Sequence, residues 1–285
     1  RGVIVKNLIL IAKIDIQETF ASKWFLFYLL TFAGLIAIFF VTGVVDSRVA
    51  GFSGLTRMLL LFIQICVIIL PIFILITTVR SINSDRETGA LEYLLSFPIS
   101  LKEYYFGKAL GRAFTVFLPI FIALILSLII AIFKNVDIPW GVFFYYTLLL
   151  LVLSFAFLSF GFLISSLIKS SELGLGFSFL FWLFLLAFLD LALIGLMMQS
   201  SINENIIYSI SLANPMQVFR IAAISLFDPN LAVIGPAAYF ILDGFGKINF
   251  LIYSALYPTL LGIICMIFGY ISFSKKDLVW KNLYF

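Results

Sequence analysis

Six stretches of the chain are apolar, nearly free of charge and long enough to cross a membrane as helices. A hydrocarbon core about 30 Å thick takes roughly 20 residues of helix to cross. A spanning segment has to be helical, because lipid offers no partner to a free backbone N–H or C=O. The sequence therefore predicts an all-α membrane protein, with a single transmembrane domain over residues 1–279. Six transmembrane helices are expected, at 24–45, 58–79, 113–133, 142–168, 174–199 and 248–274.

The composition agrees with a lipid rather than an aqueous environment. Of 285 residues, 64% are hydrophobic and 11% are charged, whereas a soluble domain carries about 25% charged residues. We expect no cleavable signal peptide, because the first apolar stretch lacks a cleavage site and is long enough to span. Residues 281–285 read KNLYF and resemble a protease-tag remnant, so they do not enter the fold prediction.

The basic residues indicate on which side of the membrane the termini lie. Six spans put both termini on one side, and cytoplasmic segments carry an excess of Lys and Arg. If the termini are inside, the inner segments hold 13 of the 18 basic residues and the outer segments hold 5. Both termini are therefore expected in the cytoplasm. Because these residues are scattered along membrane edges, no nucleic-acid partner is expected.

Two further segments outside the spans are expected to be helical. Val3–Ser22 mixes apolar residues with lysines and acids, which favours a helix lying in the membrane interface over a plain extension of the first span. The external segment 200–247 contains several prolines and glycines between apolar stretches that are too short to cross. It is expected to form short helices or re-entrant turns at the outer surface. There, Arg220 and Asp228 either pair with each other or face a partner.

A short helix is also predicted inside the longest cytoplasmic connection, Arg80–Gly111. Its apolar face consists of leucines at helical spacing after Glu87, namely Leu91, Leu94 and Leu95. Pro98 is expected to stop this helix. Leucines on a cytoplasmic helix need a surface to cover them. Either the helix folds back on the inner ends of the spans, or it docks in a groove of a partner protein, and the spacing leaves both alternatives open.

The same connection resembles the sequence signature of ABC-type-2 exporter permeases. In that family a Glu precedes Gly-Thr-Leu-Glu, followed by Leu-Leu, a Pro, and a Gly-Lys that opens the next span. Here Ala90 stands in place of the common Thr, and the pair Gly107-Lys108 follows. The order of an interfacial helix, two spans, this loop and four more spans is also similar, so the resemblance covers nearly the whole chain.

The resemblance implies that the loop helix is a coupling helix seated in a separate ATPase subunit. It implies a dimer of two permease copies in the bacterial inner membrane with two cytoplasmic ATPases, and external re-entrant helices between spans five and six. ATP and Mg are expected to bind to the ATPase. In this chain Gly107-Lys108 lacks the residue spacing of a phosphate-binding loop, so no cofactor is expected here. The residues expected to couple to the ATPase are Glu87, Thr88, Gly89, Leu91, Glu92, Leu94, Leu95 and Pro98.

A narrower resemblance covers Leu212–Pro215, Val218–Arg220 and Asp190-Leu191. These residues are similar to the permease of the transporter that matures nitrous oxide reductase. That family implies a periplasmic β-helical partner that handles copper, and transport of a sulfur compound or a pump that drives copper handover. The periplasmic partner would contact Asn214, Pro215, Arg220 and Asp228. The alternatives are another ABC-type-2 cargo (a lipid, drug or ion) and an ATP-independent channel or carrier.

Asp190 is the one carboxylate expected within a span. A charge at mid-membrane costs about 2.5–3.5 kcal/mol on insertion scales, so it should face a partner or a wet cavity. It is either part of a gate or translocation path, or a polar anchor between helices. No enzyme activity and no metal site are expected, since the chain has no histidine and Cys66 and Cys265 lie in apolar runs.

Overall fold

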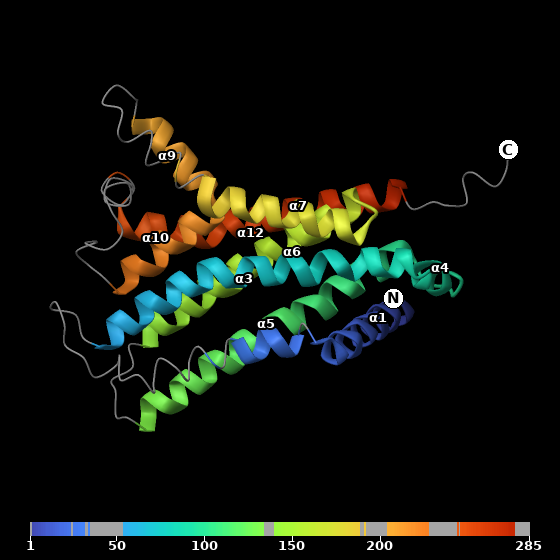
Figure 1. Ribbon diagram of the computed structural model, residues 1–285, viewed down its shortest axis with the longest axis horizontal. Helices are drawn as coiled ribbons and strands as arrows, with labels where there is room; N and C mark the ends of the chain where they lie inside the picture. Colours follow the sequence, from blue (N-terminus) through green and yellow to red (C-terminus); the bar gives the residue numbers. More distant parts are fainter. Residues whose placement is uncertain are drawn as a thin grey trace.

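A computed structural model describes residues 2–23, 25–31, 34, 54–133, 140–188, 191, 204–227, 244 and 246–276. The described part is helical and contains no strand, which confirms the all-α class (Figure 1). Its helices are α1 (Gly2–Ala21), α3 (Gly54–Glu87), α4 (Ala90–Leu95), α5 (Leu101–Phe133), α6 (Trp140–Leu167), α7 (Ser171–Leu183) with the π-helix η1 (Phe184–Phe188), α9 (Glu204–Ala213), α10 (Pro215–Phe227) and α12 (Lys247–Lys276). A further helical piece covers residues 25–31.

Five of these helices are long and apolar enough to cross a membrane. The spans run over Ile63–Glu87, Leu101–Ile129, Trp140–Leu167, Ser171–Phe188 and Lys247–Lys275. They correspond to the second to sixth spans predicted from the sequence. The first predicted span, 24–45, lies mostly outside the described residues, as do residues 192–199 and 281–285. A multi-pass membrane protein is confirmed, and the count of six spans stays a prediction.

The bundle is assembled around α6, which packs along both α12 and α3. Fourteen of its residues are buried, including four serines. Several of these hydroxyls donate to the carbonyl one turn earlier, as Ser154 does to Leu150 and Ser166 to Phe162. A polar side chain of this kind can sit in an apolar core because its own helix supplies the acceptor. The central helix therefore needs no polar partner at these positions.

The predicted N-terminal helix is present as α1, and it packs on the first turns of α5. Two glycines of α5 make this close approach possible. A Cβ on Gly107 would lie 2.8 Å from the Cβ of Ile11, and one on Gly111 would lie 2.6 Å from the carbonyl oxygen of Ala12. The opposite side of α1 exposes apolar residues, which fits a helix lying in the membrane interface; these are Ile4, Val5, Ile9 and Leu10.

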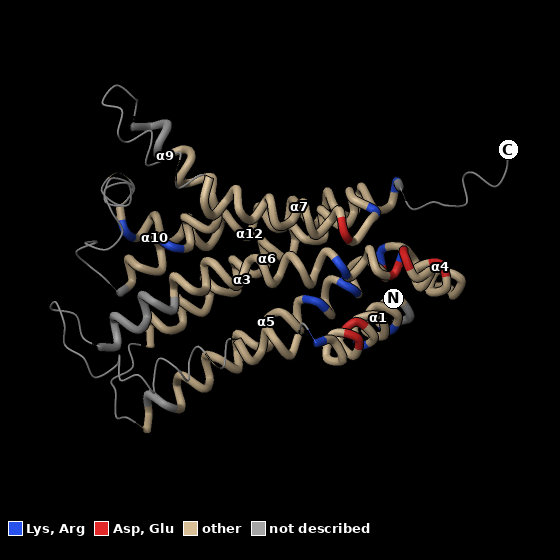
Figure 2. Tube along the Cα trace, in the orientation of Figure 1, with Lys and Arg blue, Asp and Glu red and all other residues tan. Residues whose placement is uncertain are grey.

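The connection predicted as Arg80–Gly111 is largely helical in the structure. α3 continues to Glu87 and α5 already begins at Leu101, so the true connection spans residues 88–100. α3 has 34 residues and is about 50 Å long at 1.5 Å per residue, which exceeds a hydrocarbon core of about 30 Å. Its charged end therefore extends out of the apolar layer. Figure 2 shows that most of the coloured charged residues lie at this end, around α1 and α4, whereas a few basic ones lie beside α10.

The segment predicted to be external contains two short helices, α9 and α10, which lie at the opposite end from α4 (Figure 1). At 13 residues, α10 is too short to cross a membrane. It is nevertheless buried, because it packs against α3, α6 and α12. Residues 228–243, which include Asp228, lie outside the described part of the chain.

Candidate functional site

α4, a helix of six residues, lies at the charged end of the bundle. It follows directly on α3, because Gly89 takes a left-handed conformation (φ 73°) that turns the chain. A helix this short is not stable alone, so its position depends on its contacts. Leu91 is 5% exposed, and Leu94 and Leu95 pack half-buried against the same core. The leucine face thus folds back on the chain, the first of the two alternatives left open by the sequence.

The other face of α4 is uncovered and aromatic. Tyr93 of α4 is 66% exposed, and Phe97, which follows the end of α4, is 48% exposed; their rings pack edge to face with centroids 5.3 Å apart. Glu92 is exposed beside them, and so are Thr88 and Pro98. The two aromatics were missed in the sequence analysis, although they lie only four residues apart in the chain. This face is the part of α4 that remains available to a partner.

Glu87 is the last residue of α3, and its carboxylate binds the start of α7. Oε1 accepts the backbone N–H of Ser171 at 2.7 Å, and Oε2 accepts the Ser171 hydroxyl at 2.8 Å. A carboxylate is also favoured at a helix N-terminus by the helix dipole. Glu87, predicted to couple to an ATPase, thus bonds within its own chain in this structure.

The connection after α4 is held against α1 and α5. Ser100 and Glu103 form a capping box at the start of α5, with the Ser100 N–H donating to Glu103 at 2.6 Å and the Glu103 N–H donating to the Ser100 hydroxyl at 3.2 Å. Asn7 of α1 donates to the carbonyl oxygen of Pro98 at 3.3 Å. Pro98 therefore lies in the segment after α4, which already ends at Leu95.

A second set of polar contacts joins α3 to α6 and α7. The Arg86 guanidinium donates to the carbonyl oxygen of Ser165 at 2.6 Å and to the Asn83 amide oxygen at 3.0 Å. The Asn83 amide donates in turn to the carbonyl oxygen of Ser170, which caps α7. Arg86 also lies over the ring of Phe273 in α12, 5.5 Å from its centroid. The charged end of α3 is therefore fixed to three other helices.

A buried ion cluster joins α1, α3 and α5. Lys108 is 1% exposed, and its ammonium lies 2.8 Å from Asp85, 3.3 Å from Glu18 and 3.5 Å from Asp15. Arg112, one turn later, binds Asp15 at 2.9 Å. The sequence analysis missed this ion cluster, although α5 shows a visible pattern. Gly107-Lys108 is repeated as Gly111-Arg112, so that each glycine admits α1 and each following cation binds it.

These contacts give α4 mechanical connections to most of the bundle. α4 follows α3, whose last two turns bind α7 through Glu87, α5 through Asp85 and α1 through the hydrogen bond from Ser81 to Asp15. A displacement of α4 would therefore be felt by several helices at once. None of these groups forms a nucleophile–base pair, and in the described ranges no three His, Cys, Asp or Glu side chains gather as metal ligands would. The geometry is suited to transmitting movement.

Asn214, Pro215 and Arg220, which were singled out in the segment predicted to be external, are buried or half-buried in the bundle. Asn214 is 1% exposed; its amide donates to the carbonyl oxygen of Leu185 in η1 at 2.7 Å, and its amide oxygen accepts the N–H of Met216 at 3.0 Å. Pro215 is buried and Arg220 is half-buried. Contact of these residues with a periplasmic partner stays a prediction, as does the role of Asp190, which lies outside the described residues together with Asp228.

Comparison with known proteins extends over nearly the whole chain. The family described as ABC-2 family transporter protein matches residues 9–278. Two similar proteins are each named probable ABC transporter permease protein NosY. The one from Stutzerimonas stutzeri is 25% identical over 234 residues, which cover 79% of this chain and 84% of that protein. The one from Pseudomonas aeruginosa is 24% identical over 228 residues, which cover 78% and 83%.

Proposed function

The chain belongs to the ABC-2 family of transporter proteins, and we propose that it is the permease of an exporter driven by a separate ATPase. Two copies would form the membrane dimer in the bacterial inner membrane, with two ATPase subunits on the cytoplasmic side. That side would be the end that holds α1, α4 and the last turn of α12. ATP and Mg would bind to the ATPase, and the permease would convert closure of the ATPase dimer into a change of access.

The observation that supports this proposal is the two-faced packing of α4. Its leucine face is anchored on the chain, while Tyr93, Phe97 and Glu92 remain exposed at the end of the molecule. Exposed aromatic residues at a projecting tip are typical anchors for a pocket on a partner. The anchored side would then pass the movement on to α3. A coupling helix needs both faces, one to receive the ATPase and one to move the bundle.

Transmission would follow the contacts at the end of α3. When the ATPase shifts α4, Glu87 would carry the first turn of α7 along, because its carboxylate holds Ser171 by two hydrogen bonds. Asp85 would act in parallel on Lys108 and so on α1 and α5. α7, with η1 at its outer end, would thereby receive movement from the cytoplasmic side. In this reading Glu87 acts within the permease, and the ATPase contact rests on α4.

The test is a double substitution, Tyr93→Ala with Phe97→Ala, in the permease co-expressed with its ATPase. We expect loss of ATPase co-purification and of ATP-dependent transport, with unchanged expression and thermal unfolding of the permease. The matched control is Trp140→Ala with Phe144→Ala, which removes two exposed aromatics at the other end of the bundle. Normal ATPase binding by the α4 variant would refute the coupling role, as would equal loss in the control.

We further propose that the transporter serves copper-site assembly of nitrous oxide reductase, with a periplasmic β-helical partner. This proposal is supported by the likeness to the two NosY proteins and by the motif around Asn214 and Arg220. Deletion of the permease in a host that reduces nitrous oxide should leave the reductase without its full copper complement. If the reductase is fully loaded in the deletion strain, the transporter handles another cargo, such as a lipid, a drug or an ion.

A further inference from the structure

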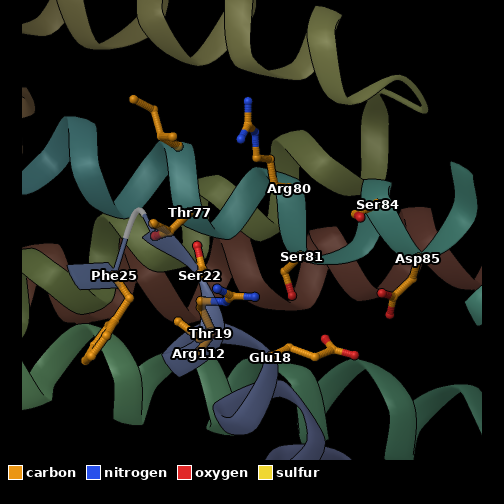
Figure 3. A pocket seen from close by; sticks show the side chains of 11 residues that line it. Glu18, Thr19, Ser22, Phe25, Thr77, Arg80, Ser81, Ser84, Asp85 and Arg112 are labelled. Atoms are coloured by element: carbon orange, nitrogen blue, oxygen red, sulfur yellow. The ribbon is translucent and has the colours of Figure 1, made fainter. Parts of the chain in front are cut away.

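A polar cavity of about 170 Å³ opens between α1, residues 25–31, α3 and α5. Figure 3 shows side chains from these elements converging on it. Its lining carries both signs of charge, with the carboxylates of Glu18 and Asp85 and the guanidinium groups of Arg80 and Arg112. Several hydroxyl groups complete the wall, among them that of Ser22. A cavity with this lining can bind a ligand that has both an anionic and a cationic group.

Arg112 gives the cavity a buried donor that is not fully used. The side chain is about one-tenth exposed, and its Nη2 donates to Asp15 at 2.9 Å, but its Nε–H has no acceptor. In Figure 3 the guanidinium reaches from α5 into the space bordered by Ser22, Ser81 and Glu18. A buried N–H without an acceptor is unfavourable, and a guanidinium matches the oxygens of a phosphate well. The anionic part of a ligand belongs here.

Glu18 offers the complementary contact for a cation. Its side chain is 57% exposed, and only one of its oxygens, Oε2, is within reach of Lys108, at 3.3 Å. A carboxylate can accept several hydrogen bonds, so a second ammonium can bind beside Lys108. A ligand cation with N–H groups would satisfy Glu18, whereas a fully methylated one has no hydrogen to donate.

The position of the cavity matches the headgroup layer of a membrane. It lies where the chain passes at Ser22 from the interfacial helix α1 to residues 25–31. A second, apolar cleft adjoins it and shares Thr19, Phe25 and Thr77 with its lining. Beyond Phe25, the residues Leu26 and Leu30 expose their side chains, as expected of a surface that contacts acyl chains. Polar and apolar regions thus follow each other in the order found in a phospholipid.

We propose that this cavity binds the headgroup of an amine-bearing zwitterionic phospholipid, of the phosphatidylethanolamine type. The phosphate accepts hydrogen bonds from Arg112 and the neighbouring hydroxyls, the primary ammonium binds Glu18, and the acyl chains lie along residues 25–31. A choline headgroup lacks the N–H donors, and an anionic headgroup without an amine brings no cation to Glu18. The site holds a resident lipid and is independent of the cargo of the transporter.

The experiment is native mass spectrometry of the purified full-length chain in detergent, titrated with phosphatidylethanolamine, phosphatidylcholine, phosphatidylglycerol or inorganic phosphate. We expect one tightly bound phosphatidylethanolamine, and about tenfold weaker binding in Glu18→Gln, because one charge-assisted hydrogen bond is lost. Glu172→Gln is the matched control, since Glu172 is an exposed carboxylate outside the cavity. Ser84→Phe, which fills the cavity mouth, should also abolish retention.

Each other outcome would overturn the proposal. Equal retention of the three lipids by the wild type and the variants would mean an unspecific annulus, and preference for phosphatidylglycerol or phosphatidylcholine would refute the role of Glu18. If inorganic phosphate displaced the lipid, the site would be one for free phosphate. Thermal unfolding of each variant, recorded in parallel, separates loss of the lipid from loss of the fold. Because Glu18 is largely exposed, the Glu18→Gln variant is expected to unfold as the wild type does in lipid-free detergent.

Discussion

Replacing Lys108 by methionine tests whether the buried ion cluster holds α1 on the bundle. Methionine has a similar length and is apolar, so the packing volume is nearly kept while the positive charge is lost. Asp15, Asp85 and Glu18, which all lie within 3.5 Å of the ammonium, would then be left with less compensation. Removing one partner from a buried ion pair costs about 3–5 kcal/mol. Since Lys108 is 1% exposed, solvent screening reduces this cost little.

The assay is thermal unfolding in detergent, followed by size-exclusion chromatography of the heated protein. A loss of 3–5 kcal/mol corresponds to a decrease in Tm of roughly 6–20 °C for a domain of this size. Lys102→Met is the matched control, because Lys102 is exposed on the first turn of the same helix and should change Tm little. Combining Lys108→Met with Asp85→Asn should destabilise less than the sum of the two single changes, since the two residues contact each other.

A Lys108→Met protein that unfolds at the wild-type temperature would refute this reasoning. It would mean that the carboxylates are solvated or protonated at little cost, and that α1 is held by its apolar contacts alone. A loss in Tm that is the same for Lys102→Met would indicate a general effect of charge on the detergent complex. The role of the ion cluster is supported only if Lys108→Met lowers Tm strongly and Lys102→Met changes Tm little.

Three further predictions concern other contacts of the bundle. Gly111→Val should detach α1, because a Cβ at this position would lie 2.6 Å from the Ala12 carbonyl oxygen. Thermal unfolding should show a loss of stability of about 1–3 kcal/mol from overpacking. Gly176→Val is the control, since a Cβ there would meet open space. Asn214→Ala should cost about 1–2 kcal/mol as a lost helix cap, measured the same way. Charge reversal at Glu87 or Glu92 should uncouple transport from ATP hydrolysis in proteoliposomes, because it breaks the contact of Glu87 with Ser171 or changes the exposed side of α4.

The spans could be predicted from the sequence because hydropathy acts over whole segments. The ends of the spans near α4 could not be predicted, because α3 continues as a helix through charged residues that carry no apolar signal. Glu87 illustrates the difference. Its spacing to Leu91 suggested one common helix, but the left-handed turn at Gly89 ends α3 and starts α4 separately. The periodicity of apolar residues does not register a turn that a single glycine makes.

The ion cluster shows a second limit, since its members are far apart in the chain. Arg112 and Asp15 are separated by 97 positions, and Lys108 and Glu18 by 90. When the sequence is read one segment at a time, each of these charges lies near the edge of a predicted span. Solvation at the membrane interface is then the simplest explanation for its position. The close approach of α1 to α5, which removes these charges from water, depends on packing. The surroundings of α4 were also predicted only in part, because the leucines were recognised and the exposed aromatics were missed.

The glycine–cation pairs of α5 make the amino end of the chain indispensable to the fold. If residues 2–21 were removed by truncation, two smooth grooves would open on α5, and Lys108 and Arg112 would lie uncovered in the membrane interface. Both cations would lose their contact with Asp15, and Lys108 would also lose its contact with Glu18. An amino-terminal deletion or a bulky fusion at this position would therefore damage a helix that begins 80 residues further along. Expression of this subunit should tolerate additions at the carboxyl end far better than changes before residue 22.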